Sequence, residues 1–416
     1  MPIKPSRLPC HWTALAALAS SAAALAPSAQ AQTDDTTPFY VGGSLGVSHV
    51  SNVFRQTKAS NSDTVLSTGL LAGLDQRFGR QHVTVDGLLQ NNRYSSNRDL
   101  NNQSYTLRSA LAWQTVGRLS GTLSASSSRA LADFNIGGGV DPIFKKNTER
   151  NDEYAALVRL GVLTRYSIEA GWTHKQRDFS AAEYDRFAFR QDTGQLGVYA
   201  TPGGNVRLGL VGRHTKGQYP RYPVGLTFNP DTLKFEIRSE ADDYTRDDFD
   251  FTTSWDTGGS SSLNTRLSRS RLRHSLDNLR DFSGTTGAVG WNWRPTGKIQ
   301  LGVYYARDTG QESTSQATDV NRLYTSWRFT GSYALTGKLS LNASASRNRS
   351  HRAGDASVML AEAFDSDKAY ALGLSWAFSR GLSLSCQYNH ASRDSSVPQY
   401  VYSASSYGCT GQAIVY

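Results

Sequence analysis

The sequence predicts an all-β protein: a single closed antiparallel transmembrane β-barrel of about 18 strands, with 16 strands as the alternative. Three observations predict it. Apolar and polar residues alternate with the strand period of two, in segments of about 10 to 15 residues. Short glycine-containing turns alternate with long polar connections. After residue 31, no run approaches the roughly 20 apolar residues of a membrane-spanning helix, so any membrane span must be made of strands.

The first 31 residues are typical of a secretory signal peptide. Lys4 and Arg7 precede an apolar stretch, and Ala-Gln-Ala at 29–31 fits a small-x-small cleavage site. We expect residues 1–31 to be removed and residues 32–416 to form the barrel. An uncleaved anchor helix is the alternative, but the apolar stretch is short and rich in Ala. A leader followed by amphipathic strands predicts the outer membrane of a Gram-negative bacterium.

The expected strands and turns follow each other in order from Phe39 to the C-terminus. In the segment 370–378, large apolar residues alternate with Ala, Gly or Ser, and segments 39–47, 83–90 and 299–305 repeat the two-sided pattern. We expect the short turns to face the periplasm and the long loops to face the exterior. Aromatic residues near the short turns predict a girdle at the membrane boundary: Trp113, Trp172, Tyr199, Trp255, Trp291, Trp293, Tyr333, Trp376 and Phe378.

Two structural features are predicted beyond the strands. The two longest loops, 132–151 and 220–242, are expected to fold inward or cap the extracellular mouth, with solvated loops as the alternative. Cys386 and Cys409 are equidistant from the turn expected at Val397-Pro398, so a symmetric hairpin places them opposite each other. We expect a disulfide between them, since the periplasm is oxidising. A register slip of one residue, leaving two free thiols, is the alternative.

The predicted polar faces carry more basic than acidic residues. Eight arginines are candidates for lining the lumen and binding a ligand: Arg108, Arg159, Arg165, Arg207, Arg213, Arg266, Arg322 and Arg328. Lys175 and Arg177 share such faces, and the acids there are Asp75, Asp86, Glu169, Asp248 and Asp250. Fixed cations would concentrate anions, and Arg binds carboxylate or phosphate in a bidentate manner. Alternatively, these arginines pair with lumen acids or support inserted loops, and both interpretations remain open.

Five stretches carry a family resemblance: GVSHVSNVFR at 46–55, SDT at 62–64, RDFSGTTG at 280–287, WRPTGK at 293–298 and YARDT at 305–309. In this order they resemble EpsL-like proteins, exopolysaccharide-associated outer-membrane barrels of the β-barrel porin-2 group. The resemblance covers nearly all of the mature chain. It implies a role in exopolysaccharide export, with exopolysaccharide and its export machinery as partners, and it assigns no catalytic residues.

The remaining chemistry is sparse. The chain has no His-Glu-x-x-His motif and its His residues are isolated, so we expect no enzyme, no metal site and no cofactor. The acidic run 242–250 is expected to be a solvated extracellular rim, with a calcium site as the alternative. The net charge of +9 points to anionic lipopolysaccharide or polysaccharide rather than nucleic acid, for which no motif is present.

The expected function is thus porin-like, associated with exopolysaccharide export. A general passive diffusion porin is the alternative, and a lumenal or surface enzyme comes third. The expected partners are outer-membrane lipid, lipopolysaccharide and the barrel-assembly machinery.

Overall fold

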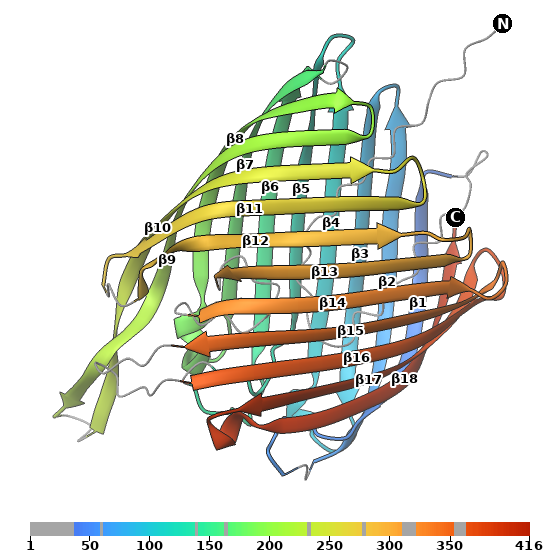
Figure 1. The fold of residues 1–416 in the computed structure, drawn as a ribbon. Coiled ribbons are helices and arrows are strands. Elements are labelled where there is room, and N and C mark those ends of the chain that lie inside the picture. Colours follow the sequence, from blue (N-terminus) through green and yellow to red (C-terminus); the bar gives the residue numbers. More distant parts are fainter. Residues whose placement is uncertain are drawn as a thin grey trace, which may run out of the picture.

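The computed structural model describes residues 37–416 except 59–60, 138–139, 162–164, 231–233, 277–279, 310–321 and 353–362. The predicted signal peptide, 1–31, lies outside the described residues. The described chain forms one sheet of eighteen antiparallel strands, which closes where β1 pairs with β18 (Figure 1). The predicted barrel and its strand number are confirmed. The alternative of 16 strands fails because β6 and β7 form a true hairpin near Tyr166.

The strands follow the chain around the barrel, each paired with its sequence neighbours. The first nine are β1 (Phe39–Val50), β2 (Asp63–Phe78), β3 (Gln81–Tyr94), β4 (Asn102–Gln114), β5 (Leu119–Leu131), β6 (Thr148–Leu160), β7 (Tyr166–Phe179), β8 (Phe189–Gly203) and β9 (Val206–Asn229). The others are β10 (Lys234–Asp256), β11 (Ser261–His274), β12 (Phe282–Trp293), β13 (Ile299–Thr309), β14 (Arg322–Ala334), β15 (Leu339–Arg352), β16 (Ala363–Ala377), β17 (Leu382–Ser395) and β18 (Tyr402–Val415). The described residues include three complete 3₁₀ turns, η1 (Arg98–Leu100), η2 (Ala182–Phe187) and η5 (Pro398–Tyr400).

Alternation decides which side chains meet lipid. On β1, Val41, Leu45 and Val47 point outward and are 56%, 58% and 51% exposed. A row of apolar side chains exposed around a closed barrel is stable only in hydrocarbon. Inside the barrel the same period places small polar residues, as on β15, where Ser340, Asn342, Ser344, Ser346 and Asn348 share the inner face. The barrel is therefore a membrane-spanning structure.

The two ends of the barrel differ. The eight turns between β2 and β3, β4 and β5, and so on to β16 and β17 are two to five residues long. They lie at the same end as both chain termini of the barrel, the periplasmic end (Figure 1). The other end carries the long connections and is extracellular. No helix among the described residues is long and apolar enough to cross a membrane.

Aromatic residues mark both membrane boundaries. Seven of the predicted girdle residues face outward beside the short turns: Trp113, Trp255, Trp291, Trp293, Tyr333, Trp376 and Phe378. Trp172 also faces outward but lies in the middle of β7. Tyr199 was predicted wrongly, because it lies on the inner face with the guanidinium of Arg207 3.8 Å above its ring. A second outward row, missed by the sequence analysis, lies toward the extracellular end and contains Tyr305, Trp327, Tyr370, Tyr388 and Tyr407.

The expectation that loop 220–242 folds inward is wrong. This segment is the extracellular continuation of β9 and β10, which pair from Asn229 and Lys234 down to Val206 and Trp255 and project beyond the barrel (Figure 1). Its prolines suggested a loop, because proline cannot donate to a β-ladder. The register shifts opposite Pro220 and Pro223 absorb them, so the ladder continues on either side.

The two cysteines lie directly opposite each other on β17 and β18. Cys386 and Cys409 are register partners with Cα atoms 4.0 Å apart, and they form a disulfide. Cys386 is also level with Leu374, and Cys409 with Val47, which are both exposed on the outer wall. The disulfide therefore faces the lipid side of the barrel.

Replacing both cysteines, Cys386→Ser with Cys409→Ser, should lower the unfolding free energy by about 3 kcal/mol, because the bond closes a loop of 23 residues in the unfolded chain. Heat-modified mobility in SDS gels measures this loss. A charged phosphine cannot enter hydrocarbon. It should therefore reduce the bond much more slowly in protein folded into bilayers than in unfolded protein. Equal reduction rates would contradict a lipid-facing bond.

Candidate functional site

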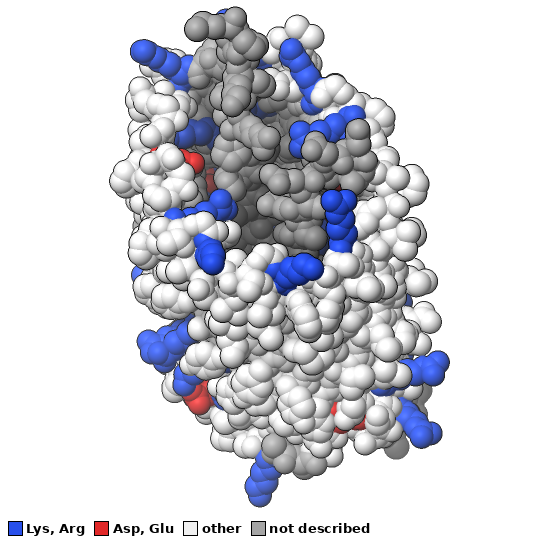
Figure 2. Space-filling model, turned by 90° about the vertical axis from the view of Figure 1, so that its right-hand side faces the viewer, with Lys and Arg blue, Asp and Glu red and all other residues white. Residues whose placement is uncertain are grey.

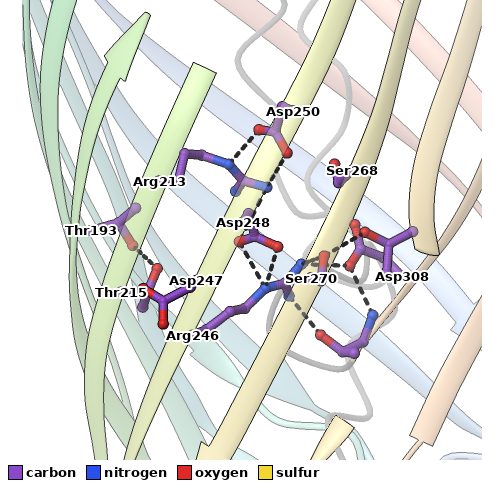
Figure 3. A network of polar contacts seen from close by, with 12 residues as sticks. Thr193, Arg213, Thr215, Arg246, Asp247, Asp248, Asp250, Ser268, Ser270 and Asp308 are labelled. Carbon is purple, nitrogen blue, oxygen red and sulfur yellow. Dashed lines mark hydrogen bonds and ion pairs between the residues drawn. The ribbon is translucent and has the colours of Figure 1, made fainter. Parts of the chain in front are cut away.

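The inner wall of β9 and β10 carries a buried charge network (Figure 3). Arg213 on β9 donates from Nε to Asp250 Oδ2 at 2.7 Å, and its Nη2 lies 3.4 Å from Asp248 Oδ2. Arg246, two residues before Asp248, donates from Nε to Asp248 Oδ2 at 2.9 Å. The cause is local: Phe249 and Phe251 face outward, so the residues between and before them face inward together.

The network continues across the barrel wall to β13. Arg246 Nη2 donates to Asp308 Oδ1 at 3.1 Å, and Arg266 on β11 binds the other carboxylate oxygen of Asp308. Arg246 also donates to Thr309 Oγ1 at 2.6 Å, and its side chain is 1% exposed. Three arginines and three aspartates thus neutralise each other on this part of the wall. Such a network is rigid, because each charge is already satisfied.

The acidic run 242–250 is therefore not a solvated rim. Asp248 and Asp250 are buried on the inner face, whereas Asp243 and Asp247 are exposed on the outer face. Asp242 is also fully buried, and its Oδ2 accepts hydrogen bonds from Arg280 and, at 2.7 Å, from His274 Nδ1. The strand period splits the run between two faces. Among the described residues, no group of three or more potential ligands could hold a metal ion.

A second ion-pair set lies nearer the periplasmic end. Glu169 on β7 is 2% exposed and binds both Arg159 on β6 and Arg207 on β9, the latter at 2.6 Å. Arg177 and Lys175, on the inner face of β7, pair with acids of β6 at 3.1 Å and 3.9 Å. These cations support the structural interpretation, in which basic residues compensate lumen acids.

Arg108 and Arg328 are different. Both face the lumen, Arg108 on β4 and Arg328 on β14, and neither forms an ion pair with a carboxylate within the described part of the chain. Arg108 is exposed, and Arg328 is half-buried with a guanidinium Nε that has no hydrogen-bond partner among described residues. Arg165 lies in the turn before β7 rather than on the wall. Arg322 starts β14, and its side chain lies outside the described residues.

The extracellular mouth is partly covered by the loop 132–147. This loop leaves β5 and reaches both the end of β17 and the loop that follows it. Arg393 Nη1 on β17 donates to the carbonyl oxygen of Asn135 at 3.1 Å, and Gln399 Nε2 in the loop donates to Asp141 at 2.6 Å. Arg55, in the loop after β1, pairs with Asp133 at 2.6 Å. The expectation that this loop caps the mouth is confirmed for its described residues.

Apolar packing holds the cap together. The cap cluster consists of Val53, Phe54, Leu100, Phe134, Ile136, Ile143, Ala181, Tyr184 and Phe187, drawn from four loops. The Tyr184 hydroxyl donates to the carbonyl oxygen of Asp133 at 2.9 Å, and burial raises the pKa of this phenol. On the same 3₁₀ turn, a hydrogen bond from Lys145 lowers the pKa of Glu183. The cap is thus a small folded unit with its own core.

One sequence pattern invites a catalytic interpretation. Residues 42–46 match Gly-x-Ser-x-Gly, the pattern of a hydrolase nucleophile elbow. An elbow requires a sharp turn between a strand and a helix, but this segment lies in the middle of β1, paired on both sides. The match therefore carries no catalytic geometry.

Comparison with known proteins gives structural likenesses only. The sequence matches no family model and no curated protein. Similar solved structures include the Pseudomonas aeruginosa outer membrane protein OpdK, solved also with vanillate, at 12% identity and TM-scores of 0.45 and 0.46, covering 91% of this chain and 98–99% of that one. P. aeruginosa OccK2 (OpdF) in complex with glucuronate has 12% identity, a TM-score of 0.44 and coverages of 91% and 97%. At this level of similarity, those ligands do not carry over to this chain.

Replacing an aspartate should cost much more unfolding free energy on the inner face of β10 than on its outer face. Asp248→Asn leaves Arg246 without its nearest counter-charge and should cost about 3–5 kcal/mol of unfolding free energy. Asp247→Asn is the matched control, since its side chain is 67% exposed on the outer wall, and it should cost about 1 kcal/mol or less. Urea unfolding in micelles measures both; equal losses would disprove the network.

The closed barrel, its lipid-facing belt, its two aromatic boundaries and its polar lumen are together the features of an outer-membrane β-barrel. The chain is a transmembrane β-barrel of a Gram-negative outer membrane.

Proposed function

We propose that the barrel is a passive channel for small anionic solutes. The observation that carries the proposal is the division of the lumen arginines. Most are neutralised by buried acids, whereas Arg108 and Arg328 face the lumen without an ion pair among the described residues. A fixed cation that forms no ion pair raises the local concentration of anions in an aqueous path.

The periplasmic end supports the same direction of selectivity. Its short turns and adjoining strand ends carry exposed basic residues: Arg77, Arg80, Arg118, Arg165, Arg294, Lys298, Lys338 and Arg380. Figure 2 shows this side of the molecule, where Lys and Arg side chains lie around a hollow. Basic residues at a channel entrance favour the entry of anions and disfavour that of cations.

The cap at the other end favours small solutes over a polymer. A folded loop joined to two neighbouring loops by hydrogen bonds and an apolar core narrows the path at the mouth. The expected link with exopolysaccharide export rests on sequence resemblance alone, and neither the lumen nor the comparisons add to it. The alternative, a passive diffusion porin, therefore fits this geometry better, with the charge distribution giving it a preference for anions.

Removing the two unpaired lumen cations should reduce anion preference. In planar bilayers with a salt gradient, the wild-type reversal potential should indicate anion selectivity. Arg108→Gln with Arg328→Gln should lower the anion-to-cation permeability ratio roughly twofold or more. Arg129→Gln with Arg93→Gln removes the same charge from the outer wall and should leave the ratio unchanged. Equal effects of both pairs, or a cation-selective wild type, would overturn the proposal.

Shortening the cap should widen the channel. Ile143 donates its backbone N–H to the carbonyl oxygen of Phe134 at 2.9 Å, so residues 135–142 can be removed without opening the base of the loop. Single-channel conductance should rise in this variant. Added anionic polysaccharide should leave wild-type conductance unchanged; a specific block by polysaccharide would instead favour an export role.

A further inference from the structure

The outer wall of β11 has an unusual order of residues. From Leu267 to His274, exposed and buried positions alternate strictly. The exposed positions are Leu267, Arg269, Arg271 and Arg273, so three arginines follow the last apolar residue on the outer face. These side chains point away from the lumen, and the proposed channel does not use them.

Two further strands repeat the arrangement. Arg307 on β13 and Arg347 and Arg349 on β15 are exposed on the same outer wall. Together with the three arginines of β11 we call them the arginine arc. The first arginine of each strand lies eight positions beyond the periplasmic strand end, at Ser261, Ile299 and Leu339. At about 3.3 Å per residue and a tilt of about 40°, this is a height of roughly 20 Å.

That height coincides with the upper edge of the apolar belt. The belt of an outer-membrane barrel is roughly 25 Å tall. On β13, Arg307 directly follows Val303 and Tyr305 on the outer face, and Tyr305 belongs to the upper aromatic row. The arginine arc therefore lies where the headgroups of the outer leaflet meet the barrel.

Small side chains separate the arginine-bearing strands. On β12, Thr285 is level with Arg269 and Ser283 with Arg271. On β14, Thr325 lies between Arg307 and Arg349, level with both. Neighbouring strands are about 4.8 Å apart, so the rows of arginines stand about 10 Å apart with shallow floors between them. A bulky sugar headgroup can rest on such a floor with guanidinium groups on both sides.

In the part of the chain that the structure describes, the six arginines of the arginine arc have no acidic partners, unlike the charged residues on the outer wall of β7–β10. Within the described chain, none of its six arginines forms an ion pair with a carboxylate. The acid directly across from Arg271 is Asp247, which pairs with His214 at 2.6 Å. On β7 and β8 the outer wall likewise pairs His174 with Asp192 at 3.0 Å. Among the described residues, β11, β13 and β15 thus carry six outer-face arginines that have no ion pair with a carboxylate.

We propose that the arginine arc is a binding site for the phosphorylated glycolipid of the outer leaflet, lipopolysaccharide. Guanidinium groups bind phosphate oxygens in a bidentate manner, which suits phosphates attached to the sugars of this headgroup. Its acyl chains would lie against the apolar belt directly below. The site fixes one arc of the barrel to the lipid and is independent of the solute that passes through the lumen.

The test compares two triple variants of the full-length protein in micelles. Arg269→Gln, Arg271→Gln and Arg273→Gln remove half of the arc. Arg93→Gln, Arg129→Gln and Arg190→Gln remove the same charge from exposed positions on β3, β5 and β8. Titration with purified lipopolysaccharide, followed by the rise in unfolding temperature, gives a midpoint for each. We expect the first variant to require at least about tenfold more lipopolysaccharide, and the control to match the wild type.

Three further ligands identify what is bound. Dephosphorylated lipopolysaccharide, phosphatidylglycerol and inorganic phosphate should each shift the wild-type unfolding temperature far less than intact lipopolysaccharide. A second variant, Arg307→Gln with Arg349→Gln, should weaken binding in the same direction and shows that the effect is not a folding defect of β11. Equal losses in the arc and control variants, or equal binding of phosphatidylglycerol, would overturn the proposal.

Discussion

The structure depends on one constraint: no backbone amide or carbonyl group can remain unpaired inside a lipid bilayer. The first strand must therefore find the last, and β1 pairs with β18 over ten residues, from Val41 to Val50. Glycine makes this close approach possible. A Cβ atom at Gly42 would lie 2.4 Å from the carbonyl oxygen of Ala413, and one at Gly408 would lie 2.6 Å from that of Val47. The seam that closes the barrel thus has no room for a side chain at either of these two positions.

Once the sheet is closed, each strand has one face toward the aqueous lumen and one toward lipid. Side chains on the two faces therefore have different partners. On β11, Arg266 takes part in the inner ion network while Arg269, three residues later, is exposed on the outer wall. Arginine thus occurs in both surroundings, because the alternation of side chains along the strand alone decides whether a position faces the lumen or the lipid. Charge inside the lumen is mostly compensated by acids, whereas the outer arginines of β11 have no ion pair with a carboxylate among the described residues.

The sequence was sufficient for everything that local alternation determines. It predicted the strands, the short turns and the opposite placement of Cys386 and Cys409, because each depends on neighbours along the chain or on a single hairpin. It missed Arg246, although parity with Asp248 places that side chain on the inner face. Its bond to Asp308, 62 residues away, joins strands that are not neighbours, and such contacts depend on the tilt of strands in the closed barrel. The bulged β9–β10 extension was missed because its prolines are typical of loops.

The lipid-facing disulfide has a consequence for how the barrel is made. Disulfide chemistry needs a thiolate, and a thiolate is costly in hydrocarbon. The bond between β17 and β18 therefore forms most readily in the periplasm, before these strands enter the membrane. A slip of one residue would turn every side chain of a strand to the wrong face. The C-terminal hairpin thus reaches the membrane with its register already fixed, as a template on which the last seam, between β18 and β1, is closed.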